Sequence, residues 1–485
     1  MKRFAFLSTI VADLGDIFVF IAPITCIPLV VTVLFAEWSM LLPMAVVPLV
    51  FFVAGLVLKR LPRNGHGHRL STAMCSVAIF WFACAAISGI PFVLGLHMSF
   101  TDALFEGMAG WTSTGFSMTR ALDTVPHTLL FWRSYMQWIG GIGIIAFSLA
   151  MASSSGLFTT KLLRTEGRDE PLMPSVISAG RSLYKIYALL TFLAIGLIMF
   201  SGLSLWESLN LALTTISTGG FTLHAEGIRY YQSITLELLL IPVMIAGALP
   251  FKLYFLILQK RRMSLFGDEQ VKLFFLFTGI GVLVIMADLL FFNTMDFFTA
   301  LEQGLFMTVS ALTTTGFQNA NPHAWASTTL LFLTMLIFIG GASGSTAGGI
   351  KLNRVALAYH GLLWWFKRVF VSGKVLIPLR IEGKVIPKAT AELETAKNML
   401  VILLSVTIIF IATLCVLQFH ITSYSITDIV FETVSAFSTC GMSTGYVSYE
   451  MPVLSKWIFI CLMWVGRLEV IPVVMLMIAL FRGPE

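Results

Sequence analysis

The chain has 485 residues, of which 57% are hydrophobic and only 12% are charged, and its mean hydropathy is +0.89. An average soluble domain carries roughly 25% charged residues, so this composition excludes a soluble globular protein and indicates a polytopic membrane protein. The net charge of +6 is typical of basic cytoplasmic loops and does not indicate nucleic-acid binding. The six cysteines have neither metal-ligand spacing nor a disulfide framework, and we expect buried thiols.

Two apolar segments open the chain, in an N-terminal region that we place at 1–69. Asp13 and Asp16 interrupt the first segment and no small-residue cleavage site follows it, so we interpret it as a retained helix and not as a signal peptide. Both segments stand outside the pattern of the remaining chain. They are predicted to form two peripheral transmembrane helices.

The rest of the chain contains four copies of one pattern, in which small or hydroxyl residues precede a glycine and a large apolar residue follows it. The four copies are Ser113, Thr114, Gly115 and Phe116; Thr218, Gly219, Gly220 and Phe221; Thr314, Thr315, Gly316 and Phe317; and Thr439, Cys440, Gly441 and Met442. At one fixed distance upstream of these glycines stand Asp102, Glu207, Gln303 and Asp428. At a nearly constant distance downstream stand Gly140, Gly247, Gly340 and Gly466. Agreement at both distances indicates an internal repeat.

Each repeat is predicted to contain a spanning helix, a short helix of about three turns that enters the membrane partway, the glycine loop and a second spanning helix. The boundaries are 70–158, 180–262, 268–371 and 390–482. Non-helical backbone at membrane depth survives only where it is buried in protein or lines water. The expected fold is therefore an all-α polytopic membrane protein, with four tandem repeats of helix, pore helix, filter loop and helix around a central pore.

Lysine and arginine are distributed asymmetrically in this arrangement. If the four loops face one side of the membrane, 26 of the 31 basic residues fall on the opposite side. Because basic residues mark the cytoplasmic side, the loops are predicted to face outward and the N-terminus to be cytoplasmic. Acids outnumber bases on the outer side. They either attract cations to the pore entrance or serve as solvated loop charges and helix caps.

The loop sequences suit a cation that must lose its water. Backbone carbonyls can replace the hydration shell of K⁺, glycine lets the backbone turn them inward, and Ser or Thr adds hydroxyl ligands. Thr- and Gly-rich segments also occur at close helix contacts, but four in register favour a potassium-binding selectivity filter. Cys440, Met442 and the additional Gly219 depart from a uniform filter signature. This departure predicts only moderate selectivity over sodium.

The four loops, the two additional N-terminal helices and the segment 340–351 resemble the Trk/Ktr/HKT superfamily of cation transporters, most closely its bacterial TrkH-type potassium uptake subunit. The resemblance implies potassium uptake across the bacterial inner membrane through a gated, channel-like pore; a symporter with alternating access, coupled to H⁺ or Na⁺, is the alternative. Glycine at all four filter positions implies a preference for K⁺. The resemblance also implies a homodimer in membrane lipid, docked on a cytosolic ring of nucleotide-binding regulatory subunits, with no organic cofactor in this chain.

The second helix of the third repeat is interrupted by a cluster of small residues. The cluster consists of Gly340, Gly341, Ser343, Gly344, Ser345, Thr346, Gly348 and Gly349. Each glycine costs a helix interior roughly 1 kcal/mol relative to alanine, so 340–350 is predicted to form an intramembrane loop. The resemblance implies that this loop, which ends near Lys351, lies under the filter and gates the pore. Close helix packing around small residues is the alternative.

Arg467 falls inside the last predicted helix. An intramembrane arginine is costly and usually faces the bundle interior or water. Below the filter it would repel cations and could hold the gating loop through carbonyl hydrogen bonds; a local pair with Glu469 is the alternative.

The sequence contains no HExxH, GxSxG or phosphate-binding fingerprint, so we expect a transporter and not an enzyme. The four repeats share one orientation. This favours a conduit over the inverted halves that are typical of many carriers.

Overall fold

The computed structural model describes the chain in eight stretches, to which the structural statements below refer. They are 2–61, 70–145, 176–258, 267–292, 294–370, 378–381, 384–419 and 424–482. All residues of the predicted filter and gating loop lie within them. The predicted boundaries at 69, 158, 262 and 371 lie outside the described residues.

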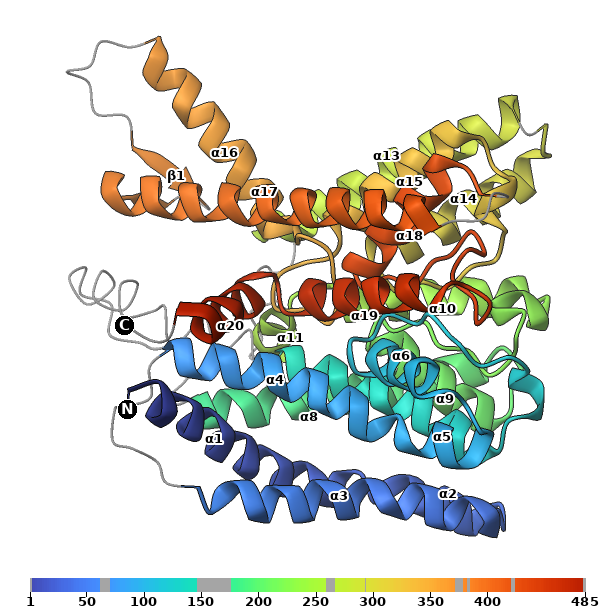
Figure 1. The fold of residues 1–485 in the computed structure, drawn as a ribbon. Coiled ribbons are helices and arrows are strands. Elements are labelled where there is room, and N and C mark those ends of the chain that lie inside the picture. The colour runs from blue at the N-terminus through green and yellow to red at the C-terminus, as the bar shows by residue number, and fades with distance from the viewer. Residues whose placement is uncertain are drawn as a thin grey trace.

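A helical hairpin forms one edge of the molecule (Figure 1). It consists of α1 (Lys2–Ile24) with its continuation α2 (Ile27–Leu34), the turn η1 (Trp38–Met40) and α3 (Leu41–Lys59). A side chain at Gly15 would collide with the backbone of α3, and one at Gly55 with the backbone of α1. These glycines therefore let the two helices approach closely. The hairpin corresponds to the predicted pair of peripheral helices.

Four copies of one arrangement follow. The first helices are α4 (Leu70–Ser88) with α5 (Ile90–Leu96), α8 (Val176–Met199), α13 (Glu269–Phe291) and α17 (Lys388–Phe419). The short helices are α6 (Phe100–Trp111), α9 (Leu205–Ile216), α14 (Phe297–Leu312) and α18 (Ile426–Phe437). After each loop comes a second helical segment: residues 127–145, α10 (Ile234–Ala248) with α11 (Phe251–Leu258), α15 (Ser327–Ile339) with α16 (Leu352–Val369), and α19 (Val453–Arg467) with α20 (Ile471–Arg482). The 3-10 turns η2 (Leu122–Thr124), η3 (Gly227–Tyr231) and η4 (Pro322–Ala324) lie between these parts.

The short helices begin with polar caps. In three of them a serine accepts a hydrogen bond from the backbone N–H of the predicted acid and donates its hydroxyl to that acid; the pairs are Ser99 with Asp102, Ser204 with Glu207 and Ser425 with Asp428. The third helix, α14, has 16 residues where the others have 12. Its cap is Asp296, so Gln303 lies within the helix and not at its start. The repeat is therefore imperfect at this helix end.

The second helices of repeats 2 and 4 break, although the sequence predicts continuous spans there. α10 meets α11 at 94°, and α19 meets α20 at 111°. Pro250 lies at the first break. Proline has no backbone N–H and so cannot donate the hydrogen bond that would continue the helix. Glu469 and Val470 lie at the second break with φ of 59° and 68°, values that a right-handed helix excludes.

A short antiparallel hairpin of β1 (Leu379–Ile381) and β2 (Lys384–Ile386) precedes the last repeat. Leu379 packs with Trp364 of α16 and Ala391 of α17 in a small apolar cluster. The sequence did not predict this hairpin in the otherwise helical fold.

The helix lengths and surfaces suit a membrane. Six helices among the described residues are long and apolar enough to span one, and counting each bent pair as one span gives eight. Large apolar side chains such as Phe192 and Phe410 are exposed on helix surfaces, as expected where lipid replaces water. α1 begins and α20 ends at one end of the bundle, and α5 lies at the opposite end (Figure 1).

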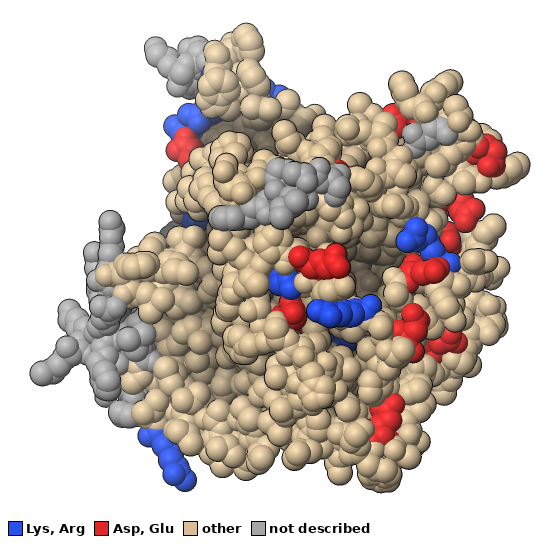
Figure 2. All heavy atoms as spheres, turned by 45° about the vertical axis from the view of Figure 1, so that its right-hand side comes forward, with Lys and Arg blue, Asp and Glu red and all other residues tan. Residues whose placement is uncertain are grey.

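The opposite end carries the loops, and we call it the outer end after its predicted orientation. Figure 2 shows acidic side chains spread over this face with few basic ones among them. Exposed acids there include Asp123, Glu226, Asp296 and Glu450. The sign of the charge agrees with the predicted acidic entrance.

Glu37 joins the peripheral hairpin to the first repeat. Its carboxylate accepts hydrogen bonds from the backbone N–H groups of His127 and Thr128 at 2.7 and 2.8 Å, and from the Thr128 hydroxyl at 2.7 Å. These N–H groups open the helix 127–145 and have no partner inside it. Partial burial acts to raise the pKa of Glu37, but the hydrogen bonds outweigh it and leave the pKa below its ordinary value.

Candidate functional site

Every short helix ends in the same turn. The second residue before the repeated glycine has a left-handed backbone with φ between 49° and 53°, at Ser113, Thr218, Thr314 and Thr439. The N–H groups of this residue and the next one donate to carbonyls of the last helical turn at 2.8 to 3.1 Å. This is the Schellman ending, where glycine is usual. A hydroxyl residue in this conformation costs of order 1 kcal/mol, and strain of this kind clusters at functional sites.

The repeated glycines have left-handed backbones too, with φ of 94° at Gly115, 79° at Gly220, 85° at Gly316 and 81° at Gly441. The residue between the two left-handed positions lies outside that region in every repeat. Such alternation turns successive carbonyls toward one side of the chain, whereas a β-strand points them to alternate sides. Glycine adopts this conformation without strain.

The four loops close into a ring. A Cβ atom on any of the four glycines would overlap the carbonyl oxygen of one residue in the next repeat. Gly115 meets Gly219, Gly220 meets Thr315, Gly316 meets Cys440, and Gly441 meets Thr114. Because these contacts return to their starting point, the loops surround one axis, and each contributes the residue before its glycine to the ring.

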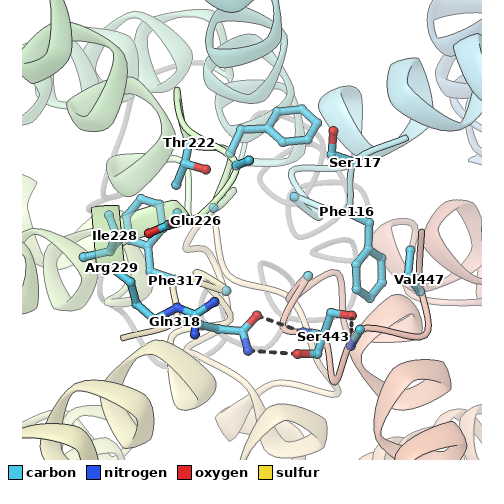
Figure 3. Close-up of a pocket in the computed structure, with 18 of the residues that line it drawn as sticks. Phe116, Ser117, Thr222, Glu226, Ile228, Arg229, Phe317, Gln318, Ser443 and Val447 are labelled. Carbon is cyan, nitrogen blue, oxygen red and sulfur yellow. Dashed lines mark hydrogen bonds between the residues drawn. The ribbon is translucent and has the colours of Figure 1, made fainter. Parts of the chain in front are cut away.

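A cavity of about 350 Å³ lies outside the ring and is lined by all four glycines. Figure 3 looks into it and shows residues of the loops, such as Phe116, Phe317 and Ser443, around its wall. The large residues after the glycines are Phe116, Phe221, Phe317 and Met442, and all four are buried. They therefore support the loops by packing.

Two equivalent acids lie behind the loops of repeats 1 and 4. Glu106 forms a buried ion pair with Arg133 at 2.6 Å, and the backbone N–H of Met118 donates to it at 2.7 Å. Glu432 accepts hydrogen bonds from the backbone and hydroxyl of Thr444 and from the Ser443 hydroxyl. Its second oxygen has no hydrogen-bond partner among the described residues. The two acids thus brace corresponding loops, one with a buried cation and one without.

Residues 340–350 leave the helix and lie against the inner side of the ring. The N–H of Gly348 donates to the Thr314 hydroxyl at 2.7 Å. The N–H of Gly349 donates to the Ser438 carbonyl at 3.1 Å. The loop thereby contacts repeats 3 and 4 directly beneath the filter turn.

Thr346 connects the same loop to repeat 2. It accepts a hydrogen bond from the Thr218 hydroxyl at 3.2 Å. Its own hydroxyl is within hydrogen-bonding distance of the carbonyls of Ile216 and Gly247, at 3.1 and 2.9 Å. Gly247 lies near the end of α10, so the loop is also held at the break in that helix.

Arg467 completes the contact with repeat 1. Its guanidinium donates to the Thr346 carbonyl at 2.8 Å, to the Gly140 carbonyl at 3.1 Å and to the Ser113 hydroxyl at 3.2 Å. A buried cation therefore lies beside the loop at the inner side of the ring. The structure brings the predicted gating loop, Arg467 and the four turns of the predicted filter together.

The alternative partner of Arg467 has other contacts. Glu469 pairs with the buried Lys351 at 3.5 Å and with Arg354.

The other predicted loop residues anchor the segment to its surroundings. Gly340 ends α15 with φ of 70°. The carbonyl of Gly341 accepts a hydrogen bond from the Leu352 N–H, and the carbonyl of Gly344 accepts one from the Phe251 N–H. The Ser343 N–H donates to the Gln270 side chain, and the Ser345 hydroxyl donates to the Ala342 carbonyl.

The downstream glycines have a packing role. A Cβ on Gly140, Gly247 or Gly466 would strike the carbonyl of the last short-helix residue in its own repeat, which is Trp111, Ile216 or Phe437. In the third repeat Gly340 packs on Gly348 of the loop instead. The repeated glycine therefore lets the second helix pack closely against the short helix of its own repeat. In the third repeat, Gly340 instead lets the loop 340–350 pack closely against the end of α15.

Comparison with known proteins identifies the family. A family model for TrkH, described as a cation transport protein, matches residues 46–482. The chain belongs to the TrkH family. An uncharacterized cation transporter of Methanocaldococcus jannaschii is 32% identical over 96% of this chain and 94% of that protein. The Trk system potassium uptake protein TrkH of Halomonas elongata is 29% identical, over 93% of this chain and 94% of its own length.

A solved structure shares the fold. The crystal structure of the potassium transporter TrkH from Vibrio parahaemolyticus matches with a TM-score of 0.84, covering 97% of this chain and 98% of that one at 23% identity. The match and the observed helices confirm the predicted all-α polytopic membrane fold. Membership of the TrkH family confirms the prediction of a transporter that is not an enzyme.

Several residues of the site were missed at the sequence level. Glu106 and Glu432 stand at the same distance before Gly115 and Gly441, so an alignment of the repeats at further offsets would have found them. Gln137, which contacts the second loop, has no counterpart in the pattern. The one feature of the sequence that pointed to Gln137 was the additional Gly219 in the loop that it contacts.

Proposed function

We propose that the chain carries potassium ions across the membrane through a gated, channel-like pore whose selectivity filter is the ring of four loops. The observation that carries this proposal is the closed ring of contacts from Gly115 to Gly441. Carbonyls held around one axis can replace the water shell of a K⁺ ion. The names of the TrkH relatives, potassium uptake proteins, support the choice of ion.

The short helices add an electrostatic contribution. Each has its polar cap at the outer end and its C-terminal turn at the ring. The partial negative charge at a helix C-terminus stabilises a nearby cation. Four such ends directed at one axis favour a dehydrated monovalent cation and disfavour anions.

The loop 340–350 and Arg467 form the gate in this proposal. Together they contact all four filter turns on the inner side. A backbone segment there obstructs the path of the ion, and a buried guanidinium repels it. Opening requires the loop to move away from Thr218, Thr314 and Ser438.

The test is flux through the purified protein in liposomes under opposing K⁺ and Na⁺ gradients. A potassium preference with turnover near 10⁶ ions per second supports the pore, because a carrier is limited by domain motions of about µs to ms. Saturable, slower flux that requires a proton or sodium gradient would support the alternating-access symporter instead.

The gate is tested by Arg467→Ala, which removes the charge and three hydrogen bonds. Potassium flux should rise roughly tenfold, as expected when one to two kcal/mol of closed-state contacts are lost. Arg467→Lys keeps the charge without the planar fork and separates electrostatic repulsion from hydrogen bonding. Deletion of 341–349 should also raise flux; unchanged flux in folded protein from both Arg467→Ala and the deletion contradicts the gate.

A further inference from the structure

The loop of repeat 2 differs from the other three at the residue before its filter glycine. The other loops have Thr114, Thr315 and Cys440 at this position, whereas repeat 2 has Gly219. The two threonines pack back on their pore helices, with their hydroxyls 2.7 Å from Thr112 and 2.8 Å from Thr313. Gly219 has no side chain to make such a contact, and glycine has the greatest backbone freedom of all residues.

Gln137 fills the space of the missing side chain. Its amide Nε2 donates to the Gly219 carbonyl at 2.7 Å, and its Oε1 accepts from the Phe221 N–H at 3.1 Å. The side chain is fully buried. A Cβ on Gly219 would overlap it. The two hydrogen bonds hold the backbone on both sides of the filter glycine Gly220.

Gln137 belongs to repeat 1, so the support reaches across a boundary between repeats. One turn earlier in the same helix, Arg133 donates to the Thr222 carbonyl at 3.0 Å and lies 4.0 Å over the Phe221 ring. This helix therefore holds the second filter loop at three backbone positions. At the same distance past the filter glycine, the other repeats have Pro242, Phe338 and Met463, which lack a side-chain amide.

We propose that Gln137 is a positioning residue of the filter and that it sets the selectivity of the pore for K⁺ over Na⁺. This inference rests on the proposed function. In the cavity-size account of selectivity, a ring of carbonyls discriminates the larger ion by resisting contraction onto the smaller one. The Gly219 carbonyl belongs to the ring, and its loop lacks the hydroxyl contact that Thr114 and Thr315 make in repeats 1 and 3, so the Gln137 amide restrains it instead.

Gln137→Leu keeps the approximate size of the side chain and removes both hydrogen bonds. The ratio of K⁺ to Na⁺ permeability in liposomes should fall roughly five- to tenfold, the effect of losing one or two net hydrogen bonds. Total cation flux should persist, because the pore remains open to both ions. A role confined to folding would lower flux or yield without changing the ratio.

Gln318→Leu is the matched control. Gln318 makes the same pair of amide bonds between repeats, donating to the Ser443 carbonyl at 2.9 Å and accepting from its N–H at 3.1 Å (Figure 3). This bridge lies beyond the filter glycine Gly441, not across it. Its loss should leave the permeability ratio near that of the wild type.

An unchanged ratio in Gln137→Leu, or an equal fall in Gln318→Leu, overturns the inference. If the leucine variant does not assemble, Gln137→Met decides: methionine, the residue that repeat 4 has at this position as Met463, is similar in length and removes both hydrogen bonds. Its ratio should fall, and an unchanged ratio overturns the inference. If the wild type itself shows no preference for K⁺, the proposed filter fails, which is a separate result.

Discussion

At the filter, four short helices end in the same turn and four glycines make the same contact with the next repeat. On the inner side of this ring, the four second helices follow three different courses: one is continuous over 127–145, two are sharply bent and one opens into the loop 340–350. The two regions are adjacent and derive from the same repeated sequence. In the proposed function they serve as filter and gate, and these two tasks differ in symmetry.

A filter needs equal ligands around an axis, and four local copies of one turn supply them. A gate needs one element that can move, and four copies of it would have to move together. The third repeat alone carries the glycine-rich segment, and the other repeats supply its contacts through Thr218, Ser438 and Arg467. The difference between the regions teaches that the proposed function depends on broken symmetry.

The largest effect is expected where the symmetric ring is disturbed. In Gly441→Ala the new methyl group would overlap the Thr114 carbonyl oxygen, and the backbone has φ of 81°. Potassium flux in liposomes should fall at least roughly tenfold, because both strain and overlap displace a filter carbonyl.

Gly202→Ala is the control for this variant. Gly202 has a similar φ of 87°, but nothing lies within 4 Å of a Cβ there. It should cost only about 1 kcal/mol of stability from backbone strain and leave flux unchanged. Equal losses of flux in both variants would show that the ring contact is unimportant.

A second comparison sets repeat 1 against repeat 4. Glu106→Gln leaves the buried Arg133 without its counter-charge and should destabilise the protein by about 3 kcal/mol. Glu432→Gln removes a charge that has no cation partner among the described residues and should cost less than about 1 kcal/mol. Thermal unfolding of the detergent-solubilised proteins measures both. Equal destabilisation would contradict the assigned role of Arg133.

The smallest effect concerns the peripheral hairpin. Because the native pKa of Glu37 lies below its ordinary value of 4.5, the carboxylate contributes stability above that pH, and the contribution is lost as the pH falls through the native pKa. Glu37→Gln should therefore unfold at a lower temperature than the wild type near pH 7. The difference should shrink as the pH falls through the lowered native pKa of Glu37. A difference that persists in acid would assign the effect to packing and not to the charge.

Much of the fold could be predicted because its signals are local. An apolar stretch of spanning length, an acid near a helix start, and a glycine after hydroxyl residues each act within a few residues. The extra turn of α14 was missed because Asp296 supplies a cap earlier than the repeated position. The break at Glu469 was missed because two non-glycine residues adopt positive φ there.

The sequence by itself determined the membrane class, the fourfold repeat and the repeated glycines of the four loops, since composition, periodicity and backbone permissiveness are properties of residues and their spacing. The tertiary structure alone decided which loops are neighbours, that Arg467 bonds to the loop 340–350 while Glu469 pairs with Lys351, and that Gln137 fills the space at Gly219. These choices join residues far apart in the chain, because a ring of four loops brings together side chains that no local pattern connects.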